Sequence, residues 1–153
     1  MKNLTLVLVF AAAICSCWSA KTTIGNNRSK RNLLNFGVMI FTATGRSPLD
    51  FNGYGCYCGF GGKGTPLDGI DRCCQMHDTC YSDLKKKGHC KSLEVYLLSY
   101  KTTLPLTCAK NNSKCRDGLC ECDVSAALCF KTQTFQEKYR KYDRSKCENE
   151  VKI

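Results

Sequence analysis

The sequence predicts a mainly helical, disulfide-rich, secreted domain in which two long antiparallel helices are joined by disulfides. Three observations predict it: an apolar N-terminal segment, a dense set of cysteines, and two segments with cysteines at matching helical spacing. Residues 1–20 carry Lys2 at the second position, continue through the apolar run LTLVLVFAAAICSCW and end in Ser19-Ala20, which is typical of a secretory signal peptide. The run is shorter than a typical membrane-spanning helix, so a signal anchor is the less favoured alternative.

Residues 21–31, KTTIGNNRSKR, are polar and basic, and the cluster Arg28-Ser29-Lys30-Arg31 suits an acidic processing-protease pocket. We interpret residues 21–31 as a propeptide and residues 32–153 as one domain; a retained basic arm is the alternative. The first 31 residues hold five of the 23 Lys and Arg residues and none of the 13 acidic residues, so the net charge falls from +10 to +5. This excess favours anionic membrane surfaces and does not by itself indicate nucleic acid.

The cysteine content predicts the covalent framework of the domain. Loss of Cys15 and Cys17 with the signal peptide leaves twelve of the fourteen cysteines, which is enough for six disulfides in an oxidising compartment. Each disulfide would add roughly 2–4 kcal/mol, mainly by restricting the unfolded chain. A zinc-binding module is an alternative that predicts free thiols.

The first elements of the domain are a helix and a glycine-rich loop. Residues 32–45 predict the N-terminal helix, in which Leu34, Val38 and Phe41 fit one face, although the apolar set is wider than one stripe. Whether these residues face the core or lipid stays open. Residues 53–64, GYGCYCGFGGKG, hold six of the twelve glycines and predict a loop whose carbonyls and amides can face a ligand.

The rest of the domain is built around two longer helices. Pro66 and Asp68 mark the start of a helix over residues 67–86, which stops at Gly88. Residues 93–106 are rich in β-branched and aromatic residues and predict a short β-hairpin. A third helix is expected over residues 106–131, interrupted near residues 111–117, and the polar tail 132–153 is expected to be loop.

The spacing of four cysteines predicts how the two long helices pair. Cys73 and Cys80 lie seven residues apart on the first of these helices, and Cys122 and Cys129 lie seven apart on the other. Two turns of helix separate each pair, so each pair lies on one face. If the helices are antiparallel, Cys73 meets Cys129 and Cys80 meets Cys122.

The same two helices bring a possible general base together. His77 shares a helix face with Cys73 and Cys80, and Asp123 follows Cys122 on the opposing helix. A carboxylate on one imidazole nitrogen fixes the tautomer and leaves the other nitrogen free to take a proton from water. Tyr81, one turn after His77, is placed to donate its hydroxyl to Asp123. A histidine that serves only as a structural hydrogen-bonding group is the alternative.

Asp78 points to a different side of its helix from His77, toward the glycine-rich loop if that loop folds back. One carboxylate with several backbone carbonyls is an oxygen-only ligand set, which suits Ca²⁺ and not zinc. Such an ion stabilises negative charge on an ester oxygen. The alternative is that Asp78 is a surface charge and that the glycines only form turns.

These residues also carry a family resemblance. YGCYCGFGGKGTPLDGIDRCCQMHDTCY resembles the calcium loop and active-site helix of the secreted phospholipase A2 family, and CECDVSAALCF resembles its second signature. The similarity covers residues 32–147 and implies the phospholipase A2 fold: an N-terminal helix, a calcium loop, two disulfide-joined helices and a small hairpin. It implies a phosphatidylcholine 2-acylhydrolase that releases a lysophospholipid and a free fatty acid by Ca²⁺-dependent hydrolysis of the sn-2 ester.

The resemblance also assigns roles to residues. It makes His77 the general base and Asp123 its partner, with Tyr81 in support. The proposed Ca²⁺ ligands are the carbonyls of Tyr57, Gly59 and Gly61 and the carboxylate of Asp78, and the Gly59 amide joins Ca²⁺ in holding the oxyanion. A second active-site tyrosine falls at Tyr96 or Tyr100, and this choice stays open.

The family's disulfide pattern implies six pairs in this chain. They are Cys56–Cys147, Cys58–Cys74, Cys73–Cys129, Cys80–Cys122, Cys90–Cys115 and Cys108–Cys120. A further bridge of many relatives starts in the first helix, where this chain has Thr42 and no cysteine. The six-disulfide count resembles the group V type and, more broadly, group I.

The expected partner is a phospholipid membrane or micelle surface, bound peripherally by a monomer. Lys85-Lys86-Lys87 and the basic segment 131–146 would attract anionic lipid, with a merely solvated surface as the alternative. A non-enzymatic toxin or receptor ligand on the same scaffold is the competing function. Asn111-Asn112-Ser113 is also a possible N-glycosylation site in this secreted chain.

Overall fold

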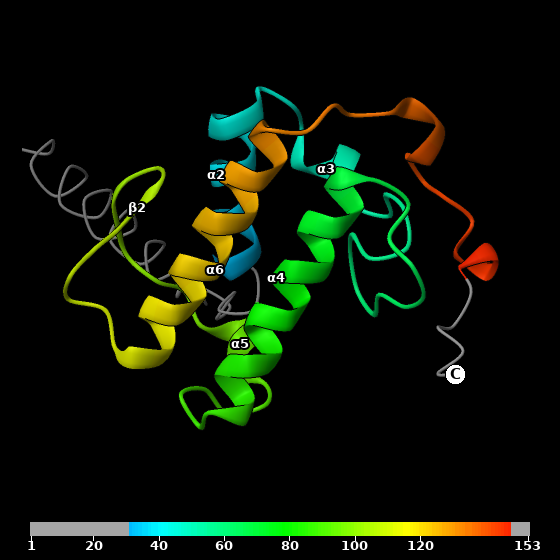
Figure 1. Cartoon of the computed structure of the whole chain (residues 1–153). Helices are drawn as coiled ribbons and strands as arrows, with labels where there is room; N and C mark the ends of the chain where they lie inside the picture. The colour runs from blue at the N-terminus through cyan, green and yellow to red at the C-terminus, as the bar shows by residue number, and fades with distance from the viewer. Residues whose placement is uncertain (1–30, 148–153) are drawn as a thin grey trace, which may run out of the picture.

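The computed structural model describes residues 31–147, and the expected signal peptide and nearly all of the propeptide lie outside them. Helices dominate, with one small antiparallel sheet, so the expected fold class is confirmed (Figure 1). The helices are α2 (Arg31–Thr44), α3 (Pro48–Phe51), α4 (Gly69–Lys86), α5 (Glu94–Leu97) and α6 (Lys114–Lys131). The strands are β1 (Thr102–Leu104) and β2 (Thr107–Cys108), and two 3-10 turns follow, η2 (Glu137–Tyr139) and η3 (Arg144–Lys146).

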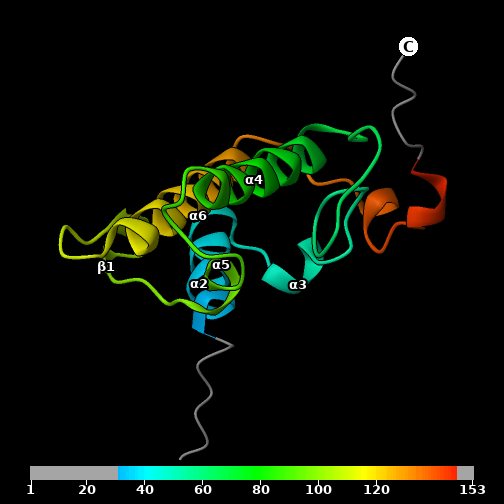
Figure 2. The same cartoon turned by 90° about the horizontal axis from the view of Figure 1, so that it is seen from below.

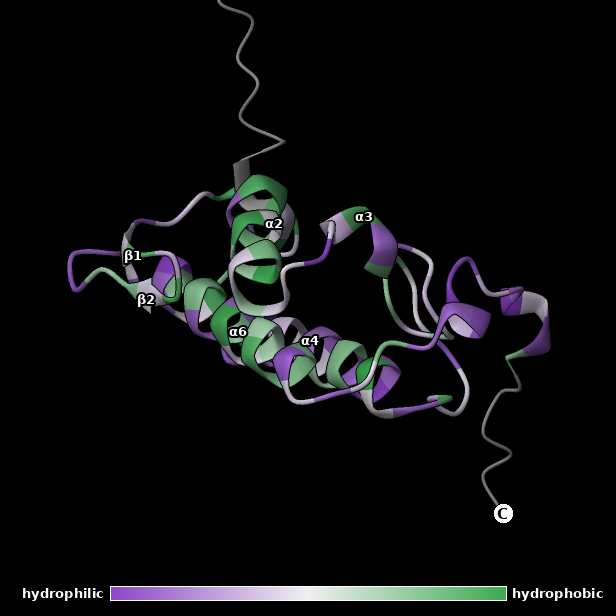
Figure 3. Ribbon diagram, turned by 90° about the horizontal axis from the view of Figure 1, so that it is seen from above, coloured by the Kyte–Doolittle hydropathy of each residue, from purple (hydrophilic) through white to green (hydrophobic). Residues whose placement is uncertain are grey.

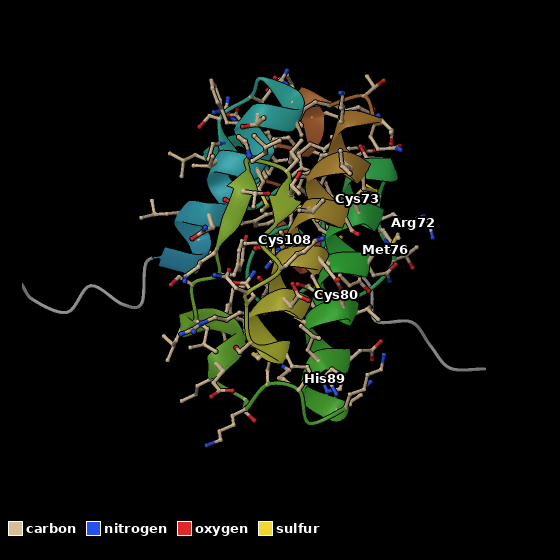
Figure 4. The ribbon with its side chains drawn as sticks, turned by 90° about the vertical axis from the view of Figure 1, so that its left-hand side faces the viewer. Arg72, Cys73, Met76, Cys80, His89 and Cys108 are labelled. Atoms are coloured by element: carbon tan, nitrogen blue, oxygen red, sulfur yellow. A yellow bond between two sulfur atoms is a disulfide. The ribbon has the colours of Figure 1, made fainter. Side chains whose placement is uncertain are left out.

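Helices α4 and α6 lie side by side and antiparallel, as the cysteine spacing predicts (Figures 1 and 2). Disulfides join Cys73 to Cys129 and Cys80 to Cys122 at their shared seam. In Figure 4, Cys73 and Cys80 lie toward α6, whereas Arg72 and Met76 project from the opposite side of α4. Two covalent links two turns apart fix both the distance between the helices and their register.

Side-chain hydrogen bonds to backbone amides lie at the starts of α4 and α5. Asp68 is the N-cap of α4, and its side chain accepts a hydrogen bond from the Asp71 amide at 3.0 Å. The helix therefore begins at Gly69, two residues after the expected start. The Glu94 carboxylate accepts a hydrogen bond from the Lys91 amide at 2.8 Å at the start of α5.

Helix α2 packs against α6 and closes the core. Its buried residues Met39 and Ile40 face inward, while Leu34, Val38 and Phe41 are 64%, 56% and 60% exposed. The predicted helical face of Leu34, Val38 and Phe41 is therefore at the surface and not in the core. In Figure 3, apolar residues run along α2, whereas the segment after α6 is mostly hydrophilic.

Two sequence expectations about the middle of the chain are wrong. The third helix does not begin near residue 106, because Thr107 and Cys108 pair with β1, and it runs unbroken from Lys114. The expected hairpin over residues 93–106 is also misplaced, because its first part forms α5, whose Val95 is fully buried. Local β propensity gives way to burial here, and the hairpin shifts toward the C-terminus.

The remaining disulfides tie the loops and the tail to the helices. All twelve cysteines of residues 31–147 are paired, in the same six pairs that the family resemblance implies. Free thiols for a zinc-thiolate site are therefore absent from the described part of the chain. The tail, expected to be loop, contains the two 3-10 turns and ends at Cys147, which is bonded to Cys56. None of the described helices is long and apolar enough to cross a membrane.

Candidate active site

His77 on α4 and Asp123 on α6 meet across the disulfide-joined seam. His77 Nε2 and Asp123 Oδ1 are 2.6 Å apart, and the Asp123 side chain is fully buried. Since a carboxylate only accepts hydrogen bonds, Nε2 carries the proton and donates it. Nδ1 makes no hydrogen bond within residues 31–147 and is left as the acceptor. The imidazole therefore has the tautomer that a general base needs.

Two tyrosines complete the hydrogen bonds of Asp123. The Tyr81 hydroxyl donates to Oδ1 at 2.8 Å, and the Tyr100 hydroxyl donates to Oδ2. Of the two candidates for the second active-site tyrosine, Tyr96 and Tyr100, the structure places Tyr100 on the carboxylate. Burial raises the pKa of Tyr100 far above its ordinary value, and the Asp123 charge adds to this, so its hydroxyl stays protonated and keeps donating.

Phe36 on α2 covers the imidazole. Its ring stacks on His77 with centroids 4.6 Å apart and an interplanar angle of 12°. The contact holds the imidazole plane and restricts water on one ring face. Sequence reasoning did not select Phe36, because it is one of many apolar residues in the first helix and nothing local distinguishes it.

The glycine-rich loop shows an alternating pattern of hydrogen bonding. Every second carbonyl accepts a bond: Cys56 from the Lys63 amide at 3.3 Å, Cys58 from the Gly53 amide at 2.8 Å, and Phe60 from Arg144 Nη1 at 2.6 Å. The carbonyls between them, of Tyr57, Gly59 and Gly61, accept none within residues 31–147. These three are the carbonyls that the resemblance assigns to Ca²⁺. Gly59 has φ +122°, a conformation that other residues rarely adopt.

Buried Asp71 anchors the start of this loop, and sequence reasoning missed it. Its carboxylate accepts hydrogen bonds from the amides of Cys56 at 2.8 Å, Tyr57 at 2.7 Å and Leu67 at 2.9 Å. Gly55 is needed beside it, because a Cβ there would lie 2.4 Å from Asp71 Cγ. The only available signal was a second aspartate just after the N-cap, and such residues are common in first helical turns.

Asp78 fits the role of a cation ligand. Its carboxylate makes no hydrogen bond and no ion pair within the described residues, although Cys58–Cys74 ties the adjoining loop to α4. Partial removal from water raises the pKa of Asp78, and three nearby basic groups, Arg144 among them, act in the opposite direction. A carboxylate in this setting gains from a bound cation.

The donor set suits calcium better than zinc. Residues 31–147 contain no cluster of three or more His, Cys, Asp or Glu side chains that could hold a metal. A metal here would be held mainly by backbone carbonyls, with one carboxylate, and such oxygen ligands are the ones that Ca²⁺ prefers. Tyr57, Gly59, Gly61 and Asp78 therefore fit this ion by their chemistry.

A partly exposed histidine bonded to a buried carboxylate, with a carbonyl-rich loop tied to the same helix, is an arrangement suited to activating water against an ester. The chain belongs to the phospholipase A2 family: the family model described as Phospholipase A2 matches residues 33–140. A phospholipase A2 of Calliactis polypus is 43% identical over 132 residues, covering 83% of this chain and 82% of its own length.

Two further relatives show the breadth of the family. The acidic phospholipase A2 of Micrurus dumerilii is 44% identical over 118 residues, which cover 76% of this chain and all of the relative. Phospholipase A2 A2-hormotoxin-Apt1a of Adamsia palliata is 38% identical over 147 residues, which cover 94% of each chain. Enzyme names and toxin names thus both occur among the relatives.

Proposed function

We propose that this protein is a secreted, calcium-dependent phospholipase A2 that hydrolyses the sn-2 ester of glycerophospholipids to a lysophospholipid and a free fatty acid. One observation carries the proposal: the helix pair that holds the His77–Asp123 contact also carries Asp78, whose charge interacts with Arg144, and Arg144 is hydrogen-bonded to the loop with three unpaired carbonyls. Base and cation ligands thereby share one rigid, disulfide-linked support.

In the proposed mechanism, water is the nucleophile. His77 Nδ1 takes a proton from water as the oxygen attacks the ester carbonyl, and Asp123 stabilises the resulting imidazolium through Nε2. The same Nδ1 then returns the proton to the leaving alkoxide. Tyr81 and Tyr100 hold the carboxylate in place through both transfers.

The loop supplies the complementary charge. The Gly59 amide donates no hydrogen bond within residues 31–147, so it is available to a developing oxyanion. Ca²⁺, held by Tyr57, Gly59, Gly61 and Asp78, would supply positive charge for that oxyanion and for the substrate phosphate.

The proposed membrane contact rests on α2. Leu34, Val38 and Phe41 are more than half exposed and form one apolar face at helical spacing. The cations Lys85-Lys86-Lys87 and those of segment 131–146 would add attraction to anionic lipid. We propose that a monomer binds peripherally through these features.

The test is fatty-acid release from phospholipid vesicles by wild type and by His77→Gln, each with Ca²⁺ and with EDTA. We expect release only by wild type with Ca²⁺, while the circular dichroism spectra of both proteins agree. Equal release in all four conditions would rule out the proposed mechanism.

A non-enzymatic toxin or receptor ligand is the second candidate, suggested by the toxin name of one relative. It predicts no release under any condition, with binding to its target unchanged in His77→Gln. The unpaired carbonyls, Asp78 and the His77–Asp123 pair favour the enzyme, because a pure binding protein has no use for this combination.

A further inference from the structure

Arg144 connects the C-terminal segment to the glycine-rich loop. It begins η3, and its Nη1 donates a hydrogen bond to the Phe60 carbonyl at 2.6 Å, across 84 residues of sequence. Two contacts hold η3 at this point: Cys147 is bonded to Cys56, and the Asp143 side chain caps the turn through the Ser145 amide at 3.0 Å. The guanidinium is thus placed by a fixed segment.

The bonded carbonyl occupies a critical position. Phe60 lies between Gly59 and Gly61, whose carbonyls are unpaired and form part of the proposed calcium ligand set. A hydrogen bond to Phe60 restrains the peptide planes on both sides of it. Without this bond, two glycines with positive φ, +122° and +76°, leave the segment few local restraints.

The Arg144 guanidinium is partly buried against the glycine-rich loop. Its Nε and Nη2 are buried and make no hydrogen bond within residues 31–147. Nη2 lies 3.7 Å from the point where a Cβ on Gly59 would be, so the group rests against that glycine. Leaving two donors unpaired is unfavourable. The bond to Phe60 is the one hydrogen bond that the guanidinium makes within residues 31–147, and its charge also acts on Asp78.

We propose that Arg144 is a positioning residue for the calcium loop, which fixes the Phe60 carbonyl and so preorganises those of Gly59 and Gly61 for the cation. The calcium part of this inference rests on the proposed function. Loss of the side chain releases the loop, so the cation must then order it on binding, at a cost in affinity.

The experiment compares Arg144→Gln with the control Lys146→Gln. Both variants remove one positive charge from η3, but the Lys146 side chain makes no hydrogen bond within residues 31–147. Calorimetric titration with Ca²⁺ measures affinity, and amide hydrogen exchange in EDTA measures protection of residues 58–64. We expect Arg144→Gln to weaken calcium binding about three- to tenfold and to speed exchange similarly, the scale of one partly exposed hydrogen bond. Lys146→Gln should match wild type, and Arg144→Lys should lie in between.

Tighter or unchanged calcium binding by Arg144→Gln would overturn the inference, as would equal effects of the two glutamine variants. Equal effects would mean that charge alone matters. A wild-type protein that does not bind Ca²⁺ would refute the proposed calcium role instead. The exchange comparison in EDTA would then still decide whether Arg144 restrains the loop.

Discussion

Replacing Tyr100 with Phe is the sharpest test of how Asp123 is held. The Tyr100 hydroxyl is the sole described donor to Asp123 Oδ2, and both side chains are buried, at 4% and 0% exposure. The substitution keeps the ring and leaves a buried carboxylate oxygen without a donor. A hydrogen bond to a charged group contributes about 1.5–3 kcal/mol. We therefore expect the free energy of unfolding to fall by about 2 kcal/mol.

Tyr81→Phe is the matched control. The Tyr81 hydroxyl donates to Asp123 Oδ1, and Oδ1 keeps its contact with His77 in the variant. Because the Tyr81 side chain is also only partly buried, we expect the free energy of unfolding to fall by about 1 kcal/mol. Urea unfolding of the disulfide-intact proteins, followed by circular dichroism, measures both values. Equal losses, or a larger loss for Tyr81→Phe, would refute the argument that Oδ2 depends on Tyr100. Vesicle hydrolysis should fall in both variants without being abolished, because the His77–Asp123 contact remains.

Three further outcomes are expected. Calcium affinity is highest when Asp78 is ionised. Because the pKa of Asp78 is raised, we expect calcium affinity to fall on acidification at a higher pH than it would with an ordinary aspartate. Calorimetry across pH measures this, and a loss of affinity confined to the usual aspartate range would contradict it. Val38→Ser should weaken vesicle binding severalfold, with the free energy of unfolding changed by less than about 0.5 kcal/mol. Met76→Ser should leave vesicle binding unchanged, because Met76 is similarly exposed but projects from α4 on the side away from α2 (Figure 4). Sedimentation with vesicles measures both variants. Peptide mass spectrometry of the secreted protein should find a glycan on exposed Asn111. Asn111→Gln should remove the glycan, whereas Asn112→Ala should retain it because the acceptor motif is kept.

Motifs with short-range geometry were predictable from sequence. The seven-residue spacing of Cys73 and Cys80 sets one helix face, so the pairing with α6 and the meeting of His77 with Asp123 followed from helix geometry. The start of α6 was not predictable in this way. Residues near Leu106 have no strong local preference, and their pairing with β1 depends on the packing of the whole hairpin.

The sequence by itself therefore determined the helix pair, the candidate base and the glycine-rich loop, because each is signalled by a spacing or a composition within a short segment of the chain. Tertiary structure alone decided that Tyr100 completes the Asp123 network, that Phe36 covers His77 and that Arg144 restrains Phe60. It also placed Val38 at the surface. These contacts join residues 23 to 84 positions apart. No local pattern encodes which distant side chain fills a given space, because packing of the whole core makes that choice.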